Sequence, residues 1–127
     1  VYDVDMDIYS PCALGATIND TTINQLKCSV IAGAANNQLM DEKLHGEILF
    51  QKGIVYAPDY LINAGGVMNC YAEIHDISDA KVMEMAGNIY QTTTDILTSS
   101  RNKNIPTSLA ANRLAEKRIS EESEKLK

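Results

Sequence analysis

Short apolar runs separated by longer mixed segments mark the first half of the chain. The opening VYDVDMDIYS alternates apolar and polar residues up to Pro11, and this alternation predicts a strand over about residues 4–9. The runs CSVIAGA at 28–34 and IVYA at 54–57 are short, apolar and rich in β-branched residues, which is typical of buried strands. Because helical segments separate the three runs, the pattern predicts parallel strands joined by right-handed crossovers.

Helix-start signals occupy the segments between these strands. Asn19 and Asp20 can cap a short helix that reaches about Leu26, and Asp41 can cap a second helix that ends at Gly53. The order is therefore strand, helix, strand, helix, strand. The apolar face of the second helix is expected to hold Leu44, Ile48 and Leu49.

After Pro58 the apolar period becomes helical and stays so to the end of the chain. We expect residues 1–78 to form the C-terminal half of a dinucleotide-binding domain and residues 79–127 to form C-terminal helices, with EESEKLK as a frayed tail. Pro106 suits the first turn of the last helix. The helical stripes are Val67, Cys70, Tyr71 and Ile74; then Val82, Met85, Ala86, Ile89, Ile96 and Leu97; then Ala111, Leu114, Ala115 and Ile119.

Composition and charge exclude several classes of function. The chain has 45% apolar and 22% charged residues, as in globular proteins, and its formal charge of −6 disfavours nucleic acid as a partner. No apolar run reaches the ~20 residues of a membrane span, so we expect no membrane partner. The three cysteines form no CxxC and the two histidines have no ligand spacing, which predicts reduced thiols, a cytoplasmic location and no metal.

The start of the chain is strand-like and carries no initiator Met and no signal-peptide pattern. We therefore expect the chain to begin partway through a larger protein.

Three loops follow the predicted strands: SPCALGA at 10–16, AANNQ at 34–38 and APDYLINAGG at 57–66. Because the carboxyl ends of parallel strands meet at one edge of a sheet, these loops are expected to lie together where open α/β sheets bind ligands. These loops are rich in small residues and carry almost no charge. Any single asparagine or glycine here can equally serve a turn or a helix cap, and only the coincidence of three such loops favours a site. The polar and flexible candidates are Asn36, Asn37, Asn63, Gly65 and Gly66.

A complete catalytic apparatus is not evident. The chain contains no GxGxxG, P-loop, GxSxG or HExxH motif, and no His or Lys lies in the three loops. Asp59 is interpreted as a helix N-cap, and Cys12 as a small packing residue near a ligand. The residues alone indicate half of a nucleotide-binding fold with a ligand edge.

At these loops the sequence resembles a known family. The segments SPCALGATIND, VIAGAANNQL, HGEILFQKGIVYAPDYLINAGGVMN and LAANRLAEKRI are similar, in unbroken order, to the C-terminal part of amino-acid dehydrogenases of the Glu/Leu/Phe/Val type. The leucine dehydrogenase branch is the most similar, and the likeness runs from about Asp7 to Ile119. The resemblance implies a Rossmann-like α/β fold, here its second half with three parallel strands and crossover helices followed by C-terminal helices.

The resemblance also implies a function. It points to NAD-dependent oxidative deamination of a branched-chain L-amino acid (leucine, valine or isoleucine) to its 2-oxo acid and ammonia, in an enzyme that is usually a homo-oligomer. The alternatives are phenylalanine as substrate, or a nucleotide-binding or interaction module without catalysis. The family's catalytic lysine and aspartate lie in an N-terminal domain that this chain lacks, so no catalytic residue is expected here.

Individual residues acquire roles only through this likeness. The implied cofactor-binding residues are Cys12, Ala13, Asn36 and Asn63. The implied substrate pocket consists of Asn36, Asn63, Gly65, Val67 and Cys70. Neither Val67 nor Cys70 offers a hydroxyl or a cation to a glutamate carboxylate, which argues for an aliphatic substrate. Without the likeness, the stripe through Val67 and Cys70 would be interpreted as core.

Overall fold

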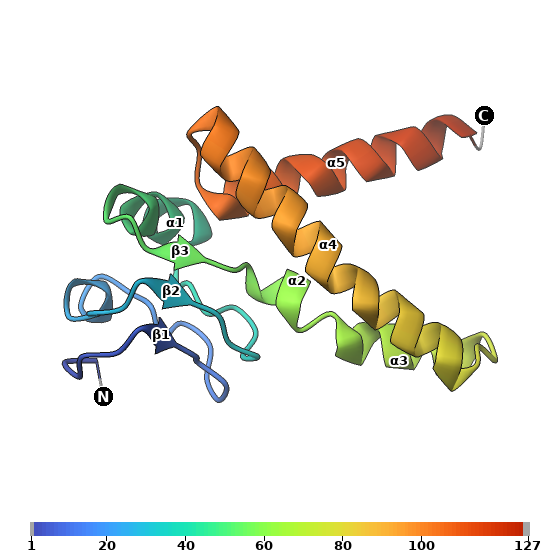
Figure 1. The fold of residues 1–127 in the computed structure, drawn as a ribbon, viewed down its shortest axis with the longest axis horizontal. Helices are drawn as coiled ribbons and strands as arrows, with labels where there is room; N and C mark the ends of the chain where they lie inside the picture. The colour runs from blue at the N-terminus through green and yellow to red at the C-terminus, as the bar shows by residue number, and fades with distance from the viewer. Residues whose placement is uncertain (1, 126–127) are drawn as a thin grey trace.

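The computed structural model describes residues 2–125 and contains a small parallel sheet at one end, with helices beside and beyond it (Figure 1). The strands are β1 (Ile8–Tyr9), β2 (Val30–Ile31) and β3 (Val55–Tyr56), in the spatial order β1-β2-β3. Both neighbouring pairs are parallel, with Ile8 opposite Val30 and Ile31 opposite Tyr56. The predicted α/β fold with three parallel strands is confirmed.

The strands are shorter than the apolar pattern predicted. The expected strand over residues 4–9 pairs continuously only at Ile8–Tyr9, and its earlier part contributes a single bridge between Asp5 and Lys27. The hydrogen bond from the Met6 N–H to the Lys27 carbonyl is 3.5 Å long, at the limit of such a bond. Alternation in sequence marks extended backbone, and the partner strand decides how much of it forms a ladder.

The first crossover contains a short 3-10 helix, η1 (Thr22–Asn24), in place of the expected helix through Leu26. The Asn19 side-chain oxygen accepts hydrogen bonds from the N–H groups of Thr21 and Thr22, both at 3.1 Å. These bonds satisfy the first free N–H groups of the turn, and the segment is too short to continue as an α-helix.

The second crossover is α1 (Glu42–Gln51), and here the predicted cap is confirmed. The Asp41 carboxylate accepts a hydrogen bond from the Leu44 N–H at 2.8 Å. The helix ends before Gly53, whose φ of +72° is a conformation that favours glycine.

The buried face of α1 differs in part from the expected one. Leu49 is fully buried as expected, but Leu44 is 49% exposed and His45 is buried in its place. His45 Nδ1 accepts from the Asp41 N–H at 2.9 Å, and Nε2 donates to the Asp20 carboxylate at 3.1 Å. A buried imidazole is tolerated because both ring nitrogens have partners.

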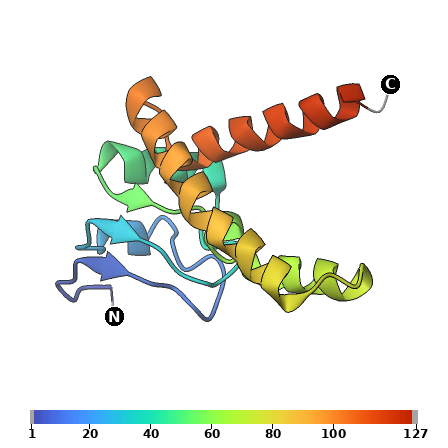
Figure 2. The same ribbon diagram turned by 45° about the vertical axis from the view of Figure 1, so that its right-hand side comes forward.

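Four helices follow the sheet: α2 (Asp59–Ile62), α3 (Gly65–Ile74), α4 (Asp79–Lys103) and α5 (Thr107–Lys125). Figures 1 and 2 show α3 leading away from the sheet, α4 returning past α2 toward α1, and α5 diverging from α4. No helix within residues 2–125 has the length and apolarity needed to cross a membrane. Residues 121–125 of the predicted frayed tail are helical, and residues 126–127 lie outside the described part.

Two apolar clusters hold the elements together. The larger lies around the sheet and includes Ile18, Ile31, Leu49 and Tyr56. The smaller joins α4 to α5 through Ile96, Ala110 and Ala111, with Leu61 and Leu114 beside it. The proposed division between residues 1–78 and 79–127 follows these clusters only approximately, because Leu61 belongs to the second one, and the division remains a prediction.

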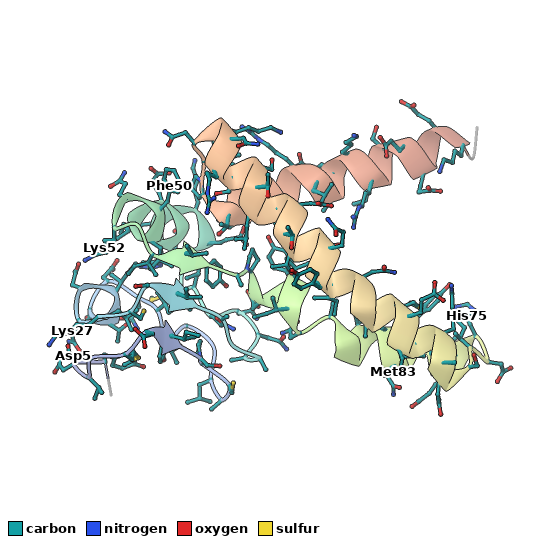
Figure 3. All side chains as sticks on the ribbon, viewed as in Figure 1. Asp5, Lys27, Phe50, Lys52, His75 and Met83 are labelled. Atoms are coloured by element: carbon teal, nitrogen blue, oxygen red, sulfur yellow. The ribbon has the colours of Figure 1, made fainter. Side chains whose placement is uncertain are left out.

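The helical stripe of α3 is not core in this chain. Val67 is 69% exposed and Ile74 is 77% exposed, so the interpretation of this stripe as core is wrong for the described residues. The period identified the helix correctly, but within residues 2–125 the side chains of Val67, Tyr71 and Ile74 stay exposed on that face. Figure 3 shows His75 and Met83 at the end of α3 and α4 farthest from the sheet.

Candidate functional site

The loops after β1 and β2 meet at the edge of the sheet through backbone contacts. The Ala16 N–H donates to the Asn37 carbonyl at 2.7 Å, and the Ala35 N–H donates to the Pro11 carbonyl at 2.9 Å. Glycine is required at both contacts. A Cβ on Gly15 would lie 2.8 Å from the Asn36 carbonyl oxygen, and a Cβ on Gly33 would overlap the backbone of Pro11.

The loop after β3 joins the same edge through two amides. Asn63 Nδ2 donates to Asn36 Oδ1 at 2.5 Å and to the Ala34 carbonyl at 3.3 Å. Because the carbonyl can only accept, these contacts fix which way both amides point. Asn63 Oδ1 and Asn36 Nδ2 take no part in these bonds, so the pair keeps one further acceptor and one further donor at the cleft. The structure therefore brings together the two asparagines that the sequence placed on different loops.

Asp59 occupies a position that the sequence did not predict. It is the first residue of α2, with Pro58 at the N-cap position, so its interpretation as the N-cap is wrong. The residue is 8% exposed, and its carboxylate accepts hydrogen bonds from the Asn37 N–H at 2.7 Å and from the Tyr56 hydroxyl at 2.9 Å. Asn37 has a φ of +52°, a conformation that asparagine tolerates and that turns its N–H toward Asp59. Asp59 thus joins the loop after β2 to the start of α2.

Burial chiefly raises the pKa of Tyr56, and the neighbouring Asp59 carboxylate raises that pKa further. The Tyr56 hydroxyl therefore keeps its proton and remains a donor to Asp59. This donor satisfies one oxygen of the buried Asp59 carboxylate.

Tyr60 connects the site to the last helix. Its hydroxyl donates to Asn112 Oδ1 at 2.9 Å, and Asn112 Nδ2 donates to Glu42 at 2.7 Å. Burial, then the charges of Glu42 and Asp59, raise the pKa of Tyr60. The N-terminal part of α5 is therefore tied to both α1 and α2.

An open cleft of about 650 Å³ lies where these contacts meet. Among the described residues that line it there is no lysine, arginine or histidine, and its one carboxylate is the internally bonded Asp59. The cleft can therefore bind a ligand through amides, small residues and one apolar side chain, without a counter-charge. Its lining consists of Ala34, Asn36, Asn37, Asp59, Tyr60, Asn63, Ala64, Gly66 and Val67.

The predicted residues of the loop after β1 lie beside this cleft and do not line it. Cys12 and Ala13 are both exposed. A hydrogen bond from the Ala34 backbone, with a second from Ser10, lowers the pKa of the Cys12 thiol. Ala34 lines the cleft and also accepts from Asn63, so all three loops contact one peptide segment.

Some of the predicted residues of α3 line the cleft and others do not. Val67 lines the cleft, and Cys70, one turn later, is exposed without lining it. Gly65 is half-buried beside the cleft, and its neighbour Gly66 is the glycine in the lining. Neither glycine has a positive φ, so neither is needed for a backbone angle that other residues avoid.

Two residues of the lining, Asp59 and Tyr60, escaped the sequence analysis as parts of the cleft. No local pattern indicates the bond between Asp59 and Asn37 or the bond between Tyr60 and Asn112, because the partners are 22 and 52 residues apart. Gly66 was among the candidates that the sequence indicated, and it lines the cleft.

No group of three or more His, Cys, Asp or Glu side chains within residues 2–125 is arranged to hold a metal ion. The chemistry of the described cleft is that of amides and backbone.

Parallel strands with an amide-lined cleft at their carboxyl ends define an α/β domain of the dinucleotide-binding kind. The profile of the Glutamate/Leucine/Phenylalanine/Valine dehydrogenase family matches residues 1–126, and the chain belongs to this family. The resemblance noted in the sequence is thereby confirmed.

Individual relatives agree with this assignment. The chain is 53% identical over 119 residues to the leucine dehydrogenase of Bacillus subtilis (strain 168), covering 94% of this chain and 32% of that protein. The leucine dehydrogenase of Bacillus cereus is 51% identical with the same coverage. The crystal structure of L-tryptophan dehydrogenase from Nostoc punctiforme superposes with a TM-score of 0.92 at 46% identity, covering 97% of this chain and 37% of the other. The chain thus spans about a third of the length of these relatives.

Proposed function

We propose that the protein containing this chain is an NAD-dependent dehydrogenase that oxidatively deaminates a branched-chain L-amino acid to its 2-oxo acid and ammonia. The observation that carries the proposal is the Asn36–Asn63 amide pair in an uncharged cleft, within a chain of the amino-acid dehydrogenase family. In this proposal the chain binds and orients the reactants.

The residues present fit the nicotinamide end of the cofactor. Asn36 Nδ2 and Asn63 Oδ1 offer a donor and an acceptor side by side, which complements a carboxamide or a pair of ribose hydroxyls. Cys12 and Ala13, beside Ala34, form the neighbouring wall in this proposal. When bound, NAD supplies the acceptor for the hydride that leaves the substrate Cα. The glycine-rich turn for its pyrophosphate is absent from the sequence.

The cleft favours a substrate with an uncharged side chain. A carboxylate side chain would be desolvated beside Val67 and Gly66 with no cation from the described lining to pair with it. Leucine, valine and isoleucine meet this requirement. Aromatic side chains meet it too, and the similarity to an L-tryptophan dehydrogenase makes phenylalanine and tryptophan the alternative substrates to test.

Proton transfer has to come from outside the described cleft. Deamination needs a base and an acid near the Cα amine, and no lysine or histidine is among the lining residues. We therefore propose that an N-terminal domain of the same protein supplies a catalytic lysine and aspartate. The homo-oligomeric state and the cytoplasmic location expected from the sequence belong to the same proposal.

The test is turnover by the full-length protein that carries this chain. NADH formation is measured with leucine, valine, isoleucine, phenylalanine, tryptophan and glutamate, and we expect the branched-chain substrates to give the highest kcat/KM. If the protein binds NAD but turns over none of them, the module without catalysis is the better description.

A pair of matched variants tests the amides. Asn63→Asp replaces the Nδ2 donor by a second acceptor facing Asn36 Oδ1 and the Ala34 carbonyl. We therefore expect kcat/KM to fall about 30- to 150-fold, which corresponds to the loss of a polar contact of about 2–3 kcal/mol. Asn102→Asp makes the same chemical change near the C-terminal end of α4, outside the cleft lining, and should leave kcat/KM unchanged. Equal activity of the two variants would refute the role of the amide pair.

A further inference from the structure

The two glycines at the start of α3 have no structural purpose inside the described chain. Gly65 and Gly66 have ordinary helical backbone, and a Cβ built on either would meet nothing within 4 Å. Glycine in a helix is less favourable than alanine because it loses more backbone freedom on folding. Gly15 and Gly33 differ, because neighbouring backbone leaves no room for a side chain there.

Gly66 and Gly65 differ in what they face. Gly66 lines the cleft between the Asn63 amide and the exposed side chain of Val67, whereas Gly65 does not line it. Gly66 therefore leaves open space at the wall of the cleft. Gly87, in the middle of α4, also has nothing within 4 Å of a built Cβ and lies outside every part of this lining.

We propose that Gly66 determines substrate size, because its missing side chain leaves room for the aliphatic part of the amino acid next to Val67. This inference rests on the proposed function and adds a specificity-determining residue to it. A substrate side chain placed there contacts the Gly66 backbone and the Val67 methyl groups, which explains why a residue that weakens the helix occupies the position.

The experiment compares Gly66→Ala and Gly87→Ala in the full-length protein. Both substitutions replace an open helical glycine, so both are expected to raise Tm slightly. Gly66→Ala is also expected to lower kcat/KM for leucine about tenfold or more, in line with a methyl group that fills part of a binding pocket. The loss should be smaller for 2-aminobutyrate, whose side chain is shorter, and KM for NAD should stay constant. Gly87→Ala should keep the kinetics of the parent protein.

Every other outcome of this experiment overturns the inference. Unchanged kcat/KM for leucine in Gly66→Ala overturns the inference and leaves the proposed function intact. Three other results would also overturn the inference, because they would show that Gly66 serves another purpose. They are an equal loss of kcat/KM for leucine and 2-aminobutyrate, a raised KM for NAD alone, and a lowered Tm. If the parent protein turns over no amino acid, the proposed function fails and this inference fails with it.

Discussion

Replacing Asp59 by alanine is expected to disconnect the loop that carries Asn36 from the helix that follows β3. The substitution removes the acceptor of two hydrogen bonds, from the Asn37 N–H at 2.7 Å and from the Tyr56 hydroxyl at 2.9 Å. Tyr56 is 3% exposed, so its hydroxyl would lose its partner without gaining water.

The magnitude follows from these two contacts. A hydrogen bond to a charged group contributes about 1.5–3 kcal/mol to stability. The Tyr56 bond is buried and counts fully, whereas Asn37 is exposed and its N–H can turn to water. We therefore expect Asp59→Ala to lower the free energy of unfolding by about 3 kcal/mol. Asp59→Asn has the same shape and keeps one acceptor oxygen, so about half of that loss is expected.

The assay combines urea unfolding with amide hydrogen exchange at Asn37. Asp59→Ala should lower the unfolding midpoint and remove the protection of the Asn37 amide proton, because that proton loses its partner. Asp95→Ala is the matched control. Asp95 lies exposed on α4 and accepts a hydrogen bond from Gln91, so this substitution should change the free energy of unfolding by less than about 0.5 kcal/mol.

Two results would refute the reasoning about Asp59. One is a stability of Asp59→Ala within about 0.5 kcal/mol of the parent protein, the range of ordinary surface substitutions. The other is an unchanged exchange rate at Asn37, because the carboxylate would then not be the group that holds this loop.

Three further predictions concern the elements around the site. Gly33→Ala should lower the free energy of unfolding by about 3 kcal/mol or more, seen in urea unfolding, because its Cβ would lie 2.5 Å from the Pro11 nitrogen, which cannot move aside. Burial raises the pKa of Tyr56 and Tyr60, so the folded protein keeps two protons that the unfolded chain releases above pH about 10. The free energy of unfolding should therefore be unchanged by these groups below that pH and should fall above it. In Tyr60→Phe the fall of the free energy of unfolding with pH should be less steep. Thr107→Val should cost about 1–2 kcal/mol in thermal unfolding, because the Tyr56 carbonyl loses a 2.6 Å hydrogen bond.

Local signals predicted the elements well where the cause was local. The cap at Asp41 and the stop at Gly53 depend on residues within four positions along the chain, and both were predicted correctly. The alternation of strands and helices was sufficient to predict parallel pairing. The lengths of the strands were overestimated, because the extent of a ladder depends on the partner strand.

The site was predicted in outline and incompletely in detail. Parallel strands require their following loops to meet, so Asn36 and Asn63 were expected on one edge and are hydrogen-bonded there. Cys70 was expected to share a pocket with Val67. Of these two residues, Val67 lines the cleft and Cys70 does not. Helical spacing gives the face of a helix, but the boundary of a cleft depends on which neighbours cover that face.

The sequence by itself determined the order of elements, their parallel pairing, the family and the edge at which amides gather. The order of elements, the pairing and the edge follow from short-range periodicity and from the chirality of the chain, which act on neighbouring residues, whereas the family follows from the likeness of the ordered loop motifs. Only the tertiary structure decided that Asp59 joins two loops, that Tyr60 reaches Asn112, and that Gly66 borders empty space. Each of these depends on residues far apart in sequence being packed together, and a hydrogen-bond partner or a vacant volume exists only once that packing has formed.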